Sequence, residues 1–243
     1  MRLGARLLIM ALVFAPVVVF SRDGDHVEAS QSSRMEYMNR LDQVASMGPD
    51  ALAGLLLDTG SCANMSLVQE RFVLNEVMNR LRQLYREDTG LEAVLIQVAT
   101  DTSRDLGVRE YALQHMMLLY EASGHKEQIA QCLFDMAQVA PLDVAALLQL
   151  HHLRQTFEVV DEATFNAWVQ ASSRRGDLRN ADRITLLAIA SASHISEILP
   201  QVRAWGTNPS SRGVAVDAIE FIATFGGEED LALLEQMQPT ADY

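Results

Sequence analysis

The chain has 243 residues, of which 49% are hydrophobic and only 6% aromatic, and its formal net charge is -13 at pH 7. This composition favours a helical core of Leu, Ala, Val and Met, and the length allows one or two domains. A strongly acidic chain repels phosphates, which excludes nucleic acid as a general partner.

The first residues are typical of an export signal. Two Arg residues precede an apolar run from Leu7 to Phe20, and the small Ser21 follows. The pattern predicts a signal peptide over residues 1–21 and a mature protein in the periplasm or outside the cell, with no membrane span after cleavage. A retained anchor is the first alternative, although the run is shorter than the roughly 20 residues that cross a bilayer. A cytoplasmic chain is the second.

A polar linker is expected at residues 22–34, and one α-helical repeat domain at residues 35–243. No segment keeps the alternation of apolar and polar residues that marks a strand. Short breakers rich in Gly, Asp and Ser divide the domain instead. The pattern predicts about twelve helices, at residues 35–46, 50–57, 65–86, 91–99, 106–121, 126–139, 142–157, 162–173, 178–191, 195–205, 211–225 and 229–237.

A weak repeat connects these helices. Segments that begin at Val108, Val144, Leu178 and Val214 align with spacings of 36, 34 and 36 residues. A period of this length is typical of stacked helical hairpins. The sequence therefore predicts an all-α, helical-hairpin repeat array.

The last repeat, SEILPQVRAWGTNPSSRGVAVDAIEFIATFGGEEDLALLEQM, resembles a HEAT repeat. Pro200 lies in its first helix, where that family often bends. Asn208 takes the place of the usual Asp between the two helices, and Val214 begins the second helix. The resemblance implies a HEAT-like α-solenoid, and proteins of this family mostly act as interaction surfaces.

The resemblance covers roughly residues 90–237. Val108 and Arg109 are similar to the Val-Arg pair that opens the family's second helix. Two positions depart from the pattern, because Ala215 stands in place of its Arg and Leu95 in place of its Pro. A tetratricopeptide-like array is the alternative.

The helix predicted at residues 106–121 is apolar on more than one side. Val108 and Met116 face one way, whereas Leu113 and Tyr120 face another. This fits the second helix of a repeat, which packs against its own first helix and against both neighbouring repeats. Gly124 is expected to end this helix.

The two cysteines, Cys62 and Cys132, are predicted to stay free thiols. They lie 70 residues apart, or two repeats. Stacked helices are about 8 to 10 Å apart, whereas a disulfide needs Cα atoms within about 7 Å. Cys132 belongs to an apolar stripe and is expected to be buried. Cys62, in the loop DTGSCANMS, is expected to be exposed.

No local motif for catalysis is present. The sequence has no HExxH, no Gly-rich phosphate loop, no G-x-S-x-G and no CxxC. We therefore predict a non-enzymatic protein with no catalytic residues, no metal ligands and no cofactor. Its expected role is an exported scaffold that binds a protein or peptide, and a structural module of a larger envelope complex is a further alternative.

His115 and His151 support a different alternative, a periplasmic metal-binding protein or enzyme. They are 36 residues apart, which equals the repeat spacing and predicts equivalent places on neighbouring helices. A hydrogen-bonded histidine ladder between repeats is the favoured interpretation, because two imidazoles do not complete a zinc site.

The predicted binding residues are Arg109, Gln114, Arg179, Arg183 and Asp217. A concentration of Arg in an acidic chain suits recognition of carboxylates, because the planar guanidinium makes two charge-assisted bonds at once. The expected partner therefore offers an acidic or C-terminal carboxylate segment.

The alternative for these Arg side chains is pairing with acids of the chain itself. Asp177, Asp182 and Glu110 are the candidates.

Overall fold

The computed structural model describes residues 31–86, 90–207 and 209–241. The predicted signal peptide and most of the predicted linker lie outside these residues. The first described helix begins at Gln31, so the last four residues predicted as linker are helical. No helix within the described ranges combines the length and the apolar character needed to cross a membrane.

The described residues confirm the all-α prediction. They form twelve α-helices and two short 3-10 helices, and no strand. The helices are α2 (Gln31–Ser46), α3 (Pro49–Leu57), α4 (Leu67–Gln83), α5 (Leu91–Thr100), α6 (Leu106–Leu119), α7 (Lys126–Met136), α8 (Asp143–Arg154), α9 (Glu162–Ser173), α10 (Asn180–Ala192), η1 (Ser196–Ile198), α11 (Leu199–Thr207), α12 (Arg212–Phe225), η2 (Glu228–Asp230) and α13 (Leu231–Ala241).

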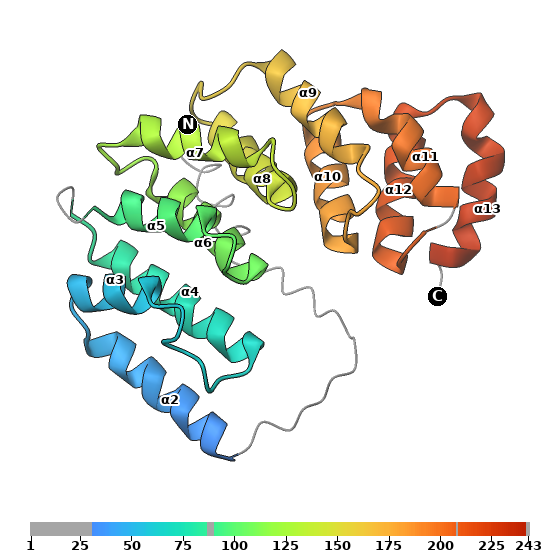
Figure 1. Ribbon diagram of the computed structural model, residues 1–243. Helices are drawn as coiled ribbons and strands as arrows, with labels where there is room; N and C mark the ends of the chain where they lie inside the picture. The colour runs from blue at the N-terminus through green and yellow to red at the C-terminus, as the bar shows by residue number, and fades with distance from the viewer. Residues whose placement is uncertain (1–30, 87–89, 208, 242–243) are drawn as a thin grey trace, which may run out of the picture.

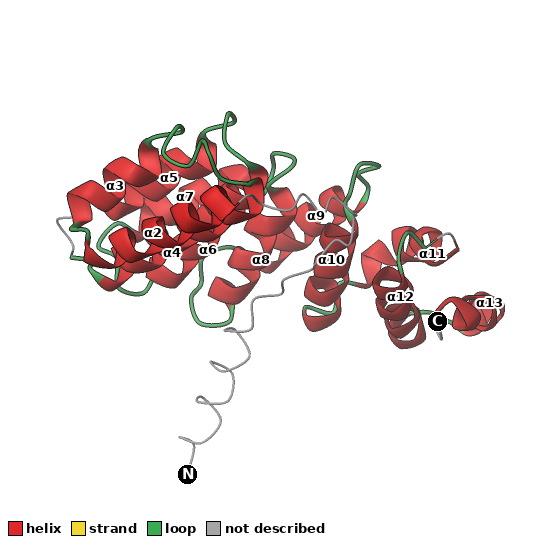
Figure 2. Ribbon diagram, turned by 90° about the horizontal axis from the view of Figure 1, so that it is seen from below, coloured by secondary structure: helices red, strands yellow, loops and turns green. Residues whose placement is uncertain are grey.

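The helices stack as hairpins into an arch (Figure 1). Each of the pairs α3–α4, α5–α6, α7–α8, α9–α10 and α11–α12 is in contact within itself. Helices α2, α4, α6, α8, α10 and α12 also contact one another in succession and form the inner layer of the arch. Figure 2 shows α3, α5 and α7 in a second row, the outer layer. This packing confirms the predicted helical array.

Short polar residues start several of these helices. The side chains of Ser66, Asp105, Asp161 and Ser211 accept hydrogen bonds from backbone N–H groups in the first turn of α4, α6, α9 and α12. Such N-caps satisfy donors that have no partner inside the helix. Pro200 is the second residue of α11, where a missing N–H costs little.

Helix α6 is buried on the two predicted sides. Val108, Leu113 and Met116 are buried, and so is Tyr120 just beyond the helix. The predicted end at Gly124 is wrong, because α6 stops at Leu119. The chain then turns back, and the N–H groups of residues 122 and 123 both donate to the carbonyl oxygen of Leu119.

The start of α6 is fixed by an ion pair from α4. The guanidinium of Arg71 makes two bonds, of 2.6 and 2.8 Å, to the carboxylate of Asp105. The residue at position 107 must be small here, since a Cβ on Gly107 would lie 2.8 Å from Nε of Arg71. Burial alone would raise the pKa of Asp105, but Arg71 and the N-cap hydrogen bonds lower it below its usual value.

Both cysteines are free thiols. Cys132 is buried as predicted, but the prediction for Cys62 is wrong, because this side chain is only 3% exposed. The loop that carries it lies against α2, and Arg40 donates to the carbonyl oxygen of Ser61. Burial raises the pKa of both thiols, to about 11 for Cys132. Neither thiol therefore has the thiolate character of a reactive cysteine.

Candidate functional site

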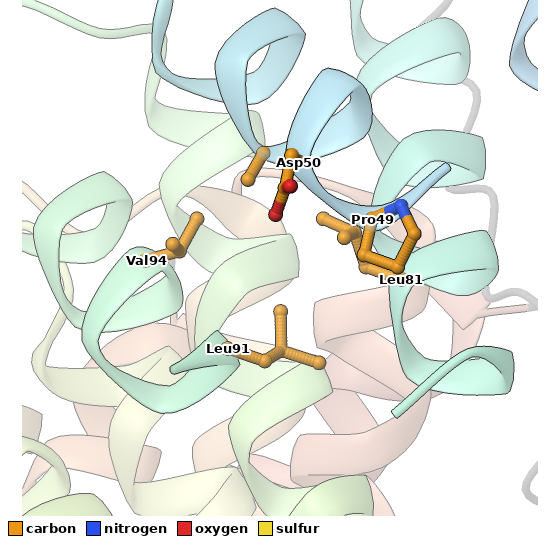
Figure 3. Close-up of a pocket in the computed structure, with 6 residues that line it drawn as sticks. Pro49, Asp50, Leu81, Leu91 and Val94 are labelled. Atoms are coloured by element: carbon orange, nitrogen blue, oxygen red, sulfur yellow. The ribbon is translucent and has the colours of Figure 1, made fainter. Parts of the chain in front are cut away.

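The inner layer presents one accessible stripe along the arch. Leu81 of α4 lies beside Pro49 and Ala53 of α3, at the small pocket drawn in Figure 3. Phe72 is nine residues earlier, which at 3.6 residues per turn places it on the opposite side of α4. Phe72 therefore faces the inside of the arch.

The same reasoning orients α6. Nε of Arg109 donates to the carbonyl oxygen of Ala99 in α5, so Leu118 lies on the side of α6 away from the outer layer. On α8, α10 and α12, we take the accessible and partly accessible side chains to continue this stripe, and we call the whole set the inner surface. These are Val68, Phe72 and Glu76 on α4, Gln114 and Leu118 on α6, Leu148 and His152 on α8, Thr185 and Ala188 on α10, and Val216 and Glu220 on α12.

Arg109 is not a surface residue. Its side chain is only 8% exposed, and its guanidinium bonds to the end of α5. The prediction that Arg109 lies on the binding surface is wrong, because the aliphatic stem fills space between α5 and α6 while the head satisfies a helix C-terminus.

Arg179 is already paired within the chain. Its Nη2 lies 2.6 Å from Oε1 of Glu110 and 2.6 Å from Oδ1 of Asp182, while its Nε bonds to Oδ2 of Asp182. These hydrogen bonds raise the pKa of Arg179, the bond to Asp182 most of all. Arg179 therefore pairs with acids of its own chain, Glu110 and Asp182, as in the alternative interpretation of the sequence.

Arg183 contacts the next repeat rather than a carboxylate. Its Nη1 donates to Oγ of Ser210 at 2.7 Å, and the guanidinium lies 5.9 Å from the ring centroid of Trp205. The neighbouring Arg175 pairs with Asp143 and Asp177. Arg175, Arg179 and Arg183, which we call the Arg cluster, therefore connect different hairpins to one another.

Gln114 and Asp217 complete the predicted set. Gln114 is partly exposed on the inner surface, one turn from Glu110. Asp217 is partly buried on α12, and burial, aided by Glu220, raises the pKa of its carboxyl group. The five predicted residues do not form one cluster, because Arg109 is interior and the others lie on three different helices or their edges.

The two histidines face opposite neighbours. Nε2 of His115 lies 3.0 Å from Oδ1 of Asn75 in the preceding inner helix, α4. Nδ1 of His151 lies 3.2 Å from Oγ of Ser193, just after the following inner helix, α10. The prediction of one histidine ladder is therefore wrong, and each imidazole makes its own contact between repeats.

The described part of the chain brings together no group of three His, Cys, Asp or Glu side chains suited to a metal ion. The pocket in Figure 3 has a volume of about 20 Å³. That is room for one water molecule.

Glu92 of α5 is a buried carboxylate that no sequence pattern predicted. Glu92 is 1% exposed and accepts hydrogen bonds from Ser123 at 2.5 Å and from Tyr85 at 2.7 Å. Burial opposes the charged form, yet these two bonds outweigh it and lower the pKa of Glu92. Through these bonds, Glu92 connects the turn after α4, which carries Tyr85, to the turn after α6, which carries Ser123. No local sequence motif predicts this network.

His115 gives a testable dependence on pH. It is 2% exposed, and burial, with a smaller contribution from Arg82, lowers its pKa to about 3. In the unfolded chain the value is about 6.5. Protonation of His115 therefore favours the unfolded chain. The stabilisation that comes from keeping His115 neutral is complete above pH ~6.5 and is lost as pH falls toward the folded pKa. We expect a loss of about 2 kcal/mol by pH 5.

Urea unfolding of the wild type and of His115→Gln at pH 7.5 and pH 5 measures this effect. The variant should lack this part of the pH dependence, whereas the exposed His125→Gln control should keep it. An equal fall in stability for His115→Gln and the wild type would contradict the assignment.

Comparison with known proteins gives no match: no family model, no curated protein and no solved structure is similar to this chain.

Proposed function

We propose that the chain is an exported, non-enzymatic scaffold that binds a protein or a peptide segment along the inner surface of its arch. The observation that supports this is the unbroken succession of inner-layer helices, with accessible or partly accessible side chains on each helix from α4 to α12. Stacked repeats present such stripes as one extended surface, which suits a long partner segment. The exported compartment rests on the N-terminal sequence.

The proposed binding site is the inner surface rather than the Arg residues predicted from the sequence. Arg109 is buried and Arg179 is held by two carboxylates. A partner carboxylate would have to displace those internal acids. Arg183, with Ser210 and Trp205 as its neighbours, is the residue of the predicted set best placed for such a contact.

Site-specific photo-crosslinking in the native host tests the proposal. A photoreactive amino acid is placed in turn at inner positions Gln114, Ala188 and Val216. Matched outer positions are exposed residues of three helices that do not belong to the inner layer, α5, α7 and α9, namely Gln97, Gln131 and Ala167.

We expect the same partner protein to be crosslinked from the inner positions and not from the outer ones, because the inner-layer helices contact one another at every step from α2 to α12. Crosslinks confined to the outer positions would contradict the proposal, and so would none from any inner position.

A further inference from the structure

Exposed apolar side chains gather at one end of the arch. Eight large hydrophobic residues are well exposed among those that the structure describes, and five of them lie on the first halves of α2 and α4. They are Met35 (67% exposed), Met38 (51%), Leu67 (49%), Val68 (59%) and Phe72 (47%). We call these five residues the N-terminal apolar patch.

The patch continues the inner surface. Helices α2 and α4 are neighbours in the inner layer. Val68 and Phe72 are one turn apart on the stripe of α4 that faces the inside of the arch. On α2, Val44 is fully buried, and Tyr37 and Leu41 pack against the core. Met35 lies nine residues before Val44, on the opposite side of the helix, and Met38 lies on its flank. Val68 and Phe72 therefore offer an apolar anchor site at the start of the inner surface, with Met35 and Met38 exposed on the neighbouring helix.

Acidic side chains accompany the patch. Asp42 follows Met38 by one turn on α2, and Glu76 follows Phe72 by one turn on α4; both are exposed. Among the nearby cations with described side chains, Arg71 is neutralised by Asp105. Arg40 and Arg80 keep their charge, but they donate to Gln43, to the carbonyl oxygen of Ser61 and to Gln83 rather than to Asp42 or Glu76.

These charges select among the possible occupants. A second copy of the chain would bring Asp42 and Glu76 against their own equivalents, and like charges repel. An anionic membrane surface attracts basic segments, whereas this chain carries a net charge of -13. A partner segment with Lys or Arg beside its apolar residues meets no such repulsion.

Resting on the proposed function, we infer that the N-terminal apolar patch binds a partner segment with apolar anchor residues flanked by basic ones. The apolar side chains cover Val68 and Phe72, and the cations lie beside Glu76 and Asp42. At this end of the arch, the expected partner segment is therefore basic rather than acidic. Burial of the anchors supplies most of the affinity, and the charges supply specificity.

Synthetic helical peptides test the inference by titration calorimetry with the mature chain. The first probe has Leu on one face and Lys on the other. The second replaces every Lys with Glu, and the third replaces every Leu with Ser. We expect the Leu/Lys peptide to bind about tenfold or more tightly than either of the others, and its affinity to fall with added salt.

Protein variants locate the binding. Val68→Ser with Phe72→Ser should weaken the Leu/Lys peptide about tenfold or more, and Glu76→Gln should weaken it severalfold at low salt only. Val139→Ser is the matched control, because Val139 is equally exposed (53%) but lies beyond α7. Circular dichroism checks that all variants keep the helical fold.

Several outcomes would overturn the inference. They are equal binding of the Leu/Glu peptide, no binding of the Leu/Lys peptide, an equal loss in Val139→Ser, self-association that Phe72→Ser abolishes, and adsorption to phosphatidylglycerol vesicles. If the inner positions still crosslink a partner in the Val68/Phe72 variant, the scaffold proposal stands and only the inference fails.

Discussion

Replacing Ile222 with alanine is expected to lower the free energy of unfolding by about 2 to 5 kcal/mol, through lost burial and the cavity left behind. Ile222 is 1% exposed on α12. It lies where α11, α12 and α13 meet, because a Cβ on Gly206 of α11 would be 3.6 Å from Ile222 Cδ1 and 2.5 Å from Cε of Met237. Residues of all three helices therefore enclose Ile222, and its truncation removes contacts at this junction.

Chemical denaturation measures the loss, and hydrogen exchange locates it. The terminal hairpin has a repeat on one side only, so fraying should begin in α12 and α13. Leu231→Ala is the control: Leu231 is 60% exposed and should change stability by less than about 0.5 kcal/mol. An Ile222→Ala protein that unfolds like the wild type would show that this interface is not packed as described.

Replacing Arg175 with alanine is expected to cost about 3 kcal/mol or more, because it leaves a carboxylate buried without its cation. Arg175 pairs with Asp143, whose side chain is only 4% exposed in the first turn of α8. The pair joins the turn before α10 to the preceding hairpin. Its second partner, Asp177, is exposed and contributes little.

A double-mutant cycle measures the coupling free energy between Arg175 and Asp143. Arg175→Ala with Asp143→Ala should recover much of the stability, since no unpaired charge then remains inside. Arg174→Ala changes the adjacent, exposed Arg and should be close to neutral. Equal losses for the Arg174 and Arg175 variants would mean that the buried pair is unimportant.

The helices of this chain were predictable because their signals are local. The predicted helix at 162–173 coincides with α9, where Asp161 caps the first turn. The helix predicted at 106–121 begins at the observed residue for the same reason. Its end was placed too late. Gly124 is a strong local breaker, but Ser123 is held by Glu92 from α5, and such a contact leaves no local trace.

The site was harder to predict because exposure depends on distant partners. Arg109 and Cys62 were both expected on the surface, yet one bonds to a helix end ten residues away and the other lies under α2. The N-terminal apolar patch was not predicted, because apolar residues with helical spacing are expected to be buried. Val68 and Phe72 have helical spacing, which equally fits a core face, and only the position of α3 reveals that they point away from it.

The bond between Glu110 and Arg179 has a mechanical consequence. It connects α6 to the start of α10 at 2.6 Å, although α8 stands between these helices in the inner layer. In a stack with contacts only between nearest neighbours, each helix interface can bend independently. The Glu110–Arg179 ion pair spans two interfaces, α6–α8 and α8–α10, so these two must bend together. Widening the arch between α6 and α10 requires this ion pair to stretch or break.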